Sequence, residues 1–168
     1  MIIIIYGLLI AIPVCLFIGT CNYFKMRQKN NLSWISITLK CVFSAYICVL
    51  LAVTFIGRPR ITGVSFIPFS SYLEAWQSAS MTGWRNILIN FIMFVPFGIL
   101  LPLIMKKNCS LTKVVLIVIL FSFGIEIAQM LTHRGVFEID DIINNTIGAL
   151  IGFIIFQTAI KNRVKEKK

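Results

Sequence analysis

Long runs of apolar residues, separated by short polar segments, dominate the pattern of this chain. Five runs cover approximately residues 2–24, 35–56, 86–105, 111–131 and 139–160. Each is close to the ~20 residues that a helix needs to cross a hydrocarbon core about 30 Å thick. None shows the period-2 alternation of a membrane β-barrel, and a helix satisfies its own backbone hydrogen bonds in lipid. The pattern therefore predicts an all-α, polytopic membrane protein, a bundle of about five transmembrane helices in a single membrane domain over residues 1–168.

The basic residues are divided unequally between the two sides of these predicted spans. Twelve lie after the first span, after the third span and in the C-terminal tail, whereas the other side has four: Arg58, Arg60, Arg85 and Arg134. Cytoplasmic segments carry the excess of Lys and Arg, so we expect the N-terminus outside and the C-terminus in the cytoplasm. A cleaved signal peptide requires a Lys or Arg before its apolar run. None precedes the first run here, so that run is expected to be a permanent span.

The one long connection, residues 57–85, falls on the outer side and is rich in aromatic residues. Ser71 and Glu74 have the spacing of a capping box, which predicts the start of a short helix. Three large residues would share one face of this helix, and that face suits a lipid interface: Tyr72, Leu73 and Trp76. Two interpretations are open, since the aromatic side chains either seat the loop on the membrane or form one wall of a site.

Polar residues collect at the outer ends of the last three predicted spans. Asn86 and Asn90 lie four apart at the start of one span, and Ser122, Glu126 and Gln129 share a face near the end of the next. The last span opens with two acidic and two amide residues: Asp140, Asp141, Asn144 and Asn145. Asn90, Glu126 and the last two amides should therefore lie at similar depth on three helices.

Carboxylates and amides at bilayer depth are costly unless they are paired, so such a cluster is a site hypothesis by default. Simpler explanations also exist for two of its parts. Asp140 and Asp141 begin a helix, where the helix dipole favours negative charge. Asn86 lies where an interfacial position alone would account for it.

Two features of the helix sequences predict how the spans pack. Gly148 and Gly152 form a GxxxG spacing next to the polar residues, which lets another helix approach closely. Pro96, inside the third span, has no N–H for the carbonyl of Ile92, so a kink and a free acceptor are expected there.

Composition narrows the class of partner. The chain is 58% hydrophobic and 13% charged, with a mean hydropathy of +0.91 and a net charge of +10. In a soluble protein this charge would suggest nucleic acid. Here the basic residues flank apolar spans, so anionic lipid headgroups explain them better and no nucleic-acid partner is expected. The five cysteines and the single histidine show no metal-ligand spacing, so no metal and no other cofactor is expected.

The order and spacing of several short motifs resemble the VanZ-like family of small bacterial membrane proteins over about residues 57–156. The motifs are Phe66-Ile-Pro68-Phe69, Asn86-x3-Asn90, Phe94-Val-Pro96-Phe-Gly98, Glu126-x2-Gln129 and Asp140-Asp141-x2-Asn144-Asn145, followed by Gly148. The name-giving members are linked to resistance to teicoplanin, a lipid-bearing glycopeptide antibiotic. The resemblance implies a multi-pass protein of the bacterial cell membrane in that functional class, and it implies no particular substrate.

We expect an outward-facing polar site at the outer leaflet that binds a membrane lipid, a lipid-linked cell-wall precursor or the antibiotic. The candidate ligand-binding residues are Arg58, Arg60, Asn86, Asn90, Glu126, Gln129, Arg134, Asp140, Asp141, Asn144 and Asn145. One alternative is an enzyme that modifies a lipid headgroup, although the HExxH and GxSxG motifs are missing and we lean against catalysis. The other is a transporter, for which five spans without an internal repeat would call for a homo-oligomer.

Overall fold

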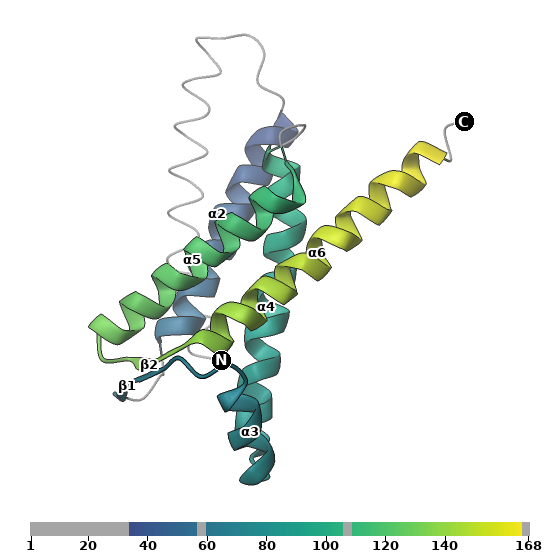
Figure 1. Ribbon diagram of the computed structural model, residues 1–168. Coiled ribbons are helices and arrows are strands. Elements are labelled where there is room, and N and C mark those ends of the chain that lie inside the picture. The colour runs from purple at the N-terminus through teal and green to yellow at the C-terminus, as the bar shows by residue number, and fades with distance from the viewer. Residues whose placement is uncertain (1–33, 57–59, 106–108, 166–168) are drawn as a thin grey trace. The chain divides into compact units, whose positions relative to one another are not determined.

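The computed structural model of the protein describes residues 34–56, 60–105 and 109–165, and it divides into two compact units, Met1–Arg58 and Pro59–Lys168 (Figure 1). The predicted span 2–24 lies outside the described residues. The single membrane domain expected over the whole chain therefore stays a prediction, and each unit is described by itself.

The described part of the first unit is one long helix, α2 (Trp34–Phe55). Its bounds agree with the predicted span 35–56. The segment Ser36–Phe55 is long and apolar enough to cross a membrane. Its one charged residue, Lys40, is exposed near the start of the helix. This is the position in which a lysine can extend its ammonium group toward the headgroups.

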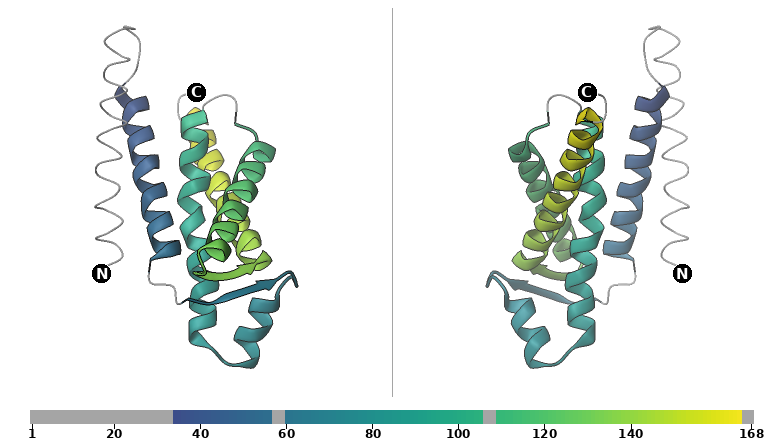
Figure 2. Two further views of the ribbon diagram at one scale, coloured as in Figure 1. Left: turned by 90° about the vertical axis from the view of Figure 1, so that its left-hand side faces the viewer. Right: turned by 90° about the vertical axis from the view of Figure 1, so that its right-hand side faces the viewer.

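The second unit is built around three long helices: α4 (Met81–Met105), α5 (Leu111–Leu131) and α6 (Ile139–Lys165). Helix α6 packs along both α4 and α5, whereas the backbones of those two helices lie farther apart and the helices meet through the rings of Phe94, Phe97 and Phe121. Figures 1 and 2 show α6 crossing the other two helices. With α2, four described helices are long and apolar enough to span a membrane. The chain is therefore a multi-pass membrane protein, as predicted, and the orientation of its termini stays a prediction.

Glycines determine how closely α4 and α6 approach each other. A Cβ atom added at Gly148 would overlap the backbone carbonyl oxygen of Phe91, and one added at Gly152 would overlap that of Val95. Gly98 of α4 is packed equally closely against the α6 backbone. The structure thus confirms that the GxxxG face of α6 is turned toward another helix, and it identifies that helix as α4.

The connection before α4 is more structured than the predicted external loop 57–85. It contains a strand, β1 (Thr62–Ser65), and a short helix, α3 (Ser70–Gln77), and α4 begins at Met81, five residues before the predicted span. Strand β1 pairs in parallel with β2 (Gly135–Glu138), with Thr62 opposite Gly135 and Ser65 opposite Glu138. Figure 2 shows this strand pair across the end of the bundle, with α3 and the first turns of α4 beyond it.

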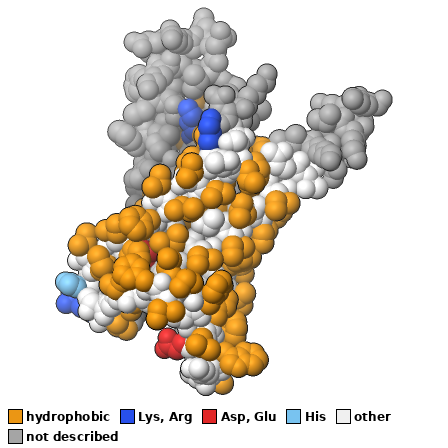
Figure 3. All heavy atoms as spheres, in the orientation of Figure 1, with side chains coloured by type: hydrophobic (Ala, Val, Ile, Leu, Met, Phe, Trp, Pro, Cys, Tyr) orange, Lys and Arg blue, Asp and Glu red, His pale blue; other side chains and the backbone are white. Residues whose placement is uncertain are grey.

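The outer surface of the long helices is apolar. Figure 3 shows hydrophobic side chains over α5 and α6, and the exposed ones include Leu116, Leu120, Phe123, Ile151 and Ile154. An exposed apolar surface of this extent is typical of a protein that contacts lipid. The polar side chains lie between the helices instead.

Candidate functional site

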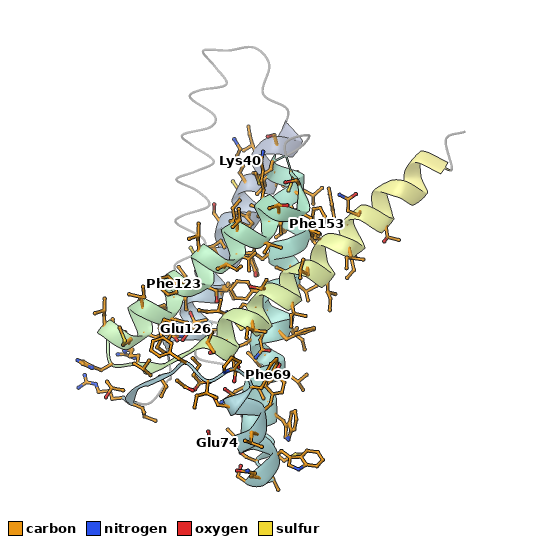
Figure 4. The ribbon with its side chains drawn as sticks, viewed as in Figure 1. Lys40, Phe69, Glu74, Phe123, Glu126 and Phe153 are labelled. Atoms are coloured by element: carbon orange, nitrogen blue, oxygen red, sulfur yellow. The ribbon has the colours of Figure 1, made fainter. Side chains whose placement is uncertain are left out.

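Eight polar side chains are buried in the second unit, and we call them the polar layer. They are Asn90 of α4, Ser122, Glu126 and Gln129 of α5, and Asp140, Asp141, Asn144 and Asn145 of α6. None of them is more than 8% exposed. The sequence named seven of them as candidate ligand-binding residues and put Ser122 on the same face of α5. Figure 4 shows Glu126 at the end of the bundle where the strand pair lies.

The α5 side of the layer follows from helical periodicity. Ser122, Glu126 and Gln129 fall at i, i+4 and i+7, so they share the face of α5 that packs on α6. The hydroxyl of Ser122 accepts a hydrogen bond of 2.7 Å from the amide Nδ2 of Asn145. The carboxylate of Glu126 accepts a hydrogen bond of 3.1 Å from the backbone N–H of Glu138, the last residue of β2. Glu126 thus fixes the end of the strand to α5.

The α6 side of the layer divides between two directions. Consecutive helical residues point about 100° apart, so neighbouring side chains reach different elements. Asn145 reaches α5, whereas the side-chain Oδ1 of Asn144 accepts a hydrogen bond from the Tyr72 hydroxyl of α3. Asp140 also reaches α3. The first two turns of α6 therefore hold α5 and α3 at the same time.

Asp140 caps the N-terminus of α3. Its Oδ1 accepts a hydrogen bond of 2.6 Å from the backbone N–H of Phe69, and its Oδ2 accepts one of 2.9 Å from that of Ser71. Phe69 has a left-handed backbone with φ of 65°, an uncommon conformation for a residue other than glycine. A carboxylate at a helix N-terminus satisfies free N–H groups and is favoured by the helix dipole.

The capping box predicted from Ser71 and Glu74 is wrong. The N-cap residue is Phe69, which makes no side-chain capping bond. The Ser71 hydroxyl donates instead to the Glu138 carboxylate at 2.8 Å. A carboxylate from a distant part of the chain has taken over the role expected of a local serine.

Tyr72 donates a hydrogen bond to the polar layer, whereas the sequence left open whether it faces lipid with Leu73 and Trp76 or forms one wall of a site. It is half-buried and its ring lies edge-on to that of Trp84. Burial raises the pKa of the Tyr72 hydroxyl, and the negative charge of Asp140 raises it further. The hydroxyl therefore remains a proton donor to Asn144 at neutral pH.

Several predicted residues lie outside the polar layer. Arg60, Arg134 and Asn86 are exposed. Arg58 lies outside the described residues. Asn86 and Asn90 were expected to share one face of α4, but only Asn90 is buried. Asn86 is exposed because it lies near the start of α4, where the helix extends beyond the bundle. Whether these residues bind a ligand stays a prediction.

Two atoms of the polar layer lack hydrogen-bond partners. The Nδ2 of Asn144 is an unpaired donor and the Oδ1 of Asn145 an unpaired acceptor, and both are buried. A buried polar group without a partner costs about 1–3 kcal/mol. Among the residues that the structure describes, no three His, Cys, Asp or Glu side chains are grouped so that they could hold a metal ion. The polar layer consists of amides, a hydroxyl and carboxylates, groups that form hydrogen bonds and interact through charge.

The sequence matches the model of a known protein family. The model of the VanZ/LLP1 family matches residues 43–161. Protein VanZ of Enterococcus faecium is 32% identical over 84 residues, which are 50% of this chain and 52% of that protein. The match therefore spans about half the length of this curated relative. No solved structure matches the chain.

Proposed function

Since the chain belongs to the VanZ/LLP1 family, we propose that it lowers the susceptibility of the bacterial cell to teicoplanin-type glycopeptides through a ligand bound at the polar layer. The ligand class is a membrane lipid, a lipid-linked cell-wall precursor or the antibiotic itself. Teicoplanin acts at the outer surface of the membrane, which is where the predicted orientation would put this end of the bundle.

The unpaired amide atoms of Asn144 and Asn145 are the observation that carries the proposal. A protein that used these residues only for packing would gain stability by pairing them or by replacing them with apolar residues. A ligand with both a donor and an acceptor group would satisfy one atom of each amide. The two amides point about 100° apart on α6, so a ligand would reach them with two different polar groups.

The carboxylates support a role in binding rather than in structure alone. Glu126 and Asp140 are each 1% exposed, and both accept hydrogen bonds from backbone N–H groups of other elements. These bonds hold β2 and α3 in place around the amides. Preorganisation of this kind lowers the entropy that a site loses when it takes up its ligand.

Antibiotic susceptibility tests the proposal directly. The protein and its variants are expressed in a teicoplanin-susceptible bacterium, and the minimum inhibitory concentration is compared at equal membrane levels. We expect Glu126→Gln and Asp141→Asn to abolish the protection given by the wild-type chain. Glu74→Gln is the matched control, because Glu74 is an exposed carboxylate outside the polar layer. Protection that survives both changes in the layer would remove it from the mechanism.

The two alternatives predict different observables. An enzyme would convert an added lipid precursor into a product that mass spectrometry detects, and the Glu126→Gln variant would not. A transporter would move its substrate across the membrane of a proteoliposome. A binding protein does neither, and it retains its lipid or antibiotic ligand on purification.

A further inference from the structure

Helix α3 has two chemically different faces. One face belongs to the site, through the Phe69 and Ser71 amides on Asp140 and the Tyr72 hydroxyl on Asn144. Ala75, on the side of α3 that meets α4, is 2% exposed and touches the backbone position of Gly83. The remaining face points away from the protein and carries large apolar side chains. Two exposed rings next to this face also contact protein, since Phe66 lies against Phe137 and Phe69 lies against Tyr72.

Large apolar side chains are exposed on α3, on the segment before it and at the start of α4, and we call them the outward surface. Its apolar side chains are Phe66 at 67% exposure, Ile67 at 71%, Phe69 at 60%, Leu73 at 57%, Trp76 at 76% and Met81 at 83%. Figure 4 labels Phe69 at the start of α3 and Glu74 farther along it. A surface built from aromatic and aliphatic residues at this exposure marks a contact with a partner or a membrane.

The sequence of α4 fixes the depth of this surface. From Ile87 to Met105 the helix has no charged residue, and these residues extend about 28 Å, close to the ~30 Å of a hydrocarbon core. The first turns, Met81 to Asn86, include the exposed Arg85 and Asn86 and therefore project beyond the hydrocarbon. Since α3 packs on α4 at Gly83, it lies beside these projecting turns.

The contacts between α6 and α4 extend this depth to the start of α6. Helix α6 contacts α4 at the pair Gly148 and Phe91, and both helices run away from the strand pair (Figure 2). Asp140 lies eight residues before Gly148 in α6, and Gly83 lies eight residues before Phe91 in α4. The capped end of α3 and its packing contact are thus at one level, just beyond the hydrocarbon core.

We propose that α3 and the segment before it lie in the phospholipid headgroup region, with these six apolar side chains in contact with lipid. The occupant of the surface is the bilayer itself, because the surface continues from a membrane-spanning helix and is at the depth of the headgroups. Tryptophan and phenylalanine are the residues that favour this zone. The same short helix then contacts phospholipid on one side and the polar layer on the other.

Fluorescence quenching in proteoliposomes tests this placement. The full chain and the Trp76→Phe variant are reconstituted in phosphatidylcholine brominated either near the headgroup or near the end of the acyl chain, and acrylamide is added from the water. We expect Trp76→Phe to lose the component of emission that the shallow bromines quench most strongly. Trp84→Phe is the matched control, because Trp84 is half-buried beside Tyr72, and it should retain that component.

Two results would overturn the proposal. If Trp76→Phe instead loses the component quenched by acrylamide and insensitive to bromine, α3 lies in water. If it loses a component that neither agent quenches, protein covers the surface, and cross-linking would show whether this protein is a second copy of the chain. A change confined to the exposed Trp76 leaves the buried contacts intact, so unaltered circular dichroism is expected in all samples.

Discussion

Adjacent side chains in α6 serve different parts of the protein. Asn144 accepts a hydrogen bond from the Tyr72 hydroxyl of α3, while Asn145 donates one to Ser122 of α5. Asp140 holds the N-terminus of α3, and Asp141 next to it points about 100° away. Residues that look equivalent in the sequence are therefore expected to differ in what their replacement disturbs.

Asp140→Asn should release the start of α3. The amide can offer one oxygen to the two N–H groups that the carboxylate now satisfies, and the charge that favours the helix N-terminus is lost. We expect α3 to lose about 1–3 kcal/mol of local stability. Hydrogen exchange should become faster at the amides of Phe69 and Ser71. In Asp141→Asn these amides should keep wild-type protection, and equal exchange in both variants would contradict the capping role.

Replacing Asn145 separates stability from function. Asn145→Leu combined with Ser122→Ala removes both partners of a buried hydrogen bond together with an amide Oδ1 that has no partner, so thermal stability should stay equal or rise. The protection against teicoplanin should be lost, because the amide is proposed to bind the ligand. Thermal unfolding in detergent and the minimum inhibitory concentration measure the two effects. A parallel loss of both would mean that Asn145 is a structural residue.

At the scale of elements, close packing of α4 and α6 positions the polar layer. Gly148→Ala would place a methyl group against the carbonyl oxygen of Phe91, and relief of the overlap requires the helices to separate. We expect a destabilisation of about 1–3 kcal/mol, visible as a lower unfolding temperature. Gly124→Ala on α5 is the matched control, since a Cβ there meets nothing within 4 Å. It should be neutral or slightly stabilising because alanine favours a helix.

The helices and most of the polar layer were predictable because their signals are local. The predicted span 111–131 coincides with α5, and α6 begins at the predicted residue. The periodicity of Ser122, Glu126 and Gln129 along α5 was enough to place them on one buried face.

The remaining features depend on residues far apart in the chain. Each strand has only four residues, too few for an alternating pattern, and its partner lies on the other side of three helices. The cap on α3 comes from Asp140, 71 residues away from Phe69. Local rules therefore assigned the cap to Ser71 and left open whether Tyr72 faces lipid or a site.

At the scale of the whole molecule, the charge distribution predicts the orientation in the membrane. A fluorescent protein that folds only in the cytoplasm, fused after Lys168, should fluoresce, because twelve basic residues lie on that side. The same protein fused to the N-terminus and exported should remain dark. Alkaline phosphatase, which is active only outside, gives the converse readout. The opposite pattern would place the polar layer at the inner leaflet and remove its access to teicoplanin.

The parallel pairing of β1 with β2 has a consequence for biosynthesis. Strand β1 leaves the ribosome before three helices that must be inserted, and its partner β2 is followed directly by α6. The strand pair and the bond from Glu138 to Glu126 await β2, and the cap on α3 awaits the first turn of α6. A nascent chain arrested before Gly135 therefore carries its helices in the membrane but has no assembled site, so maturation ends with the insertion of α6.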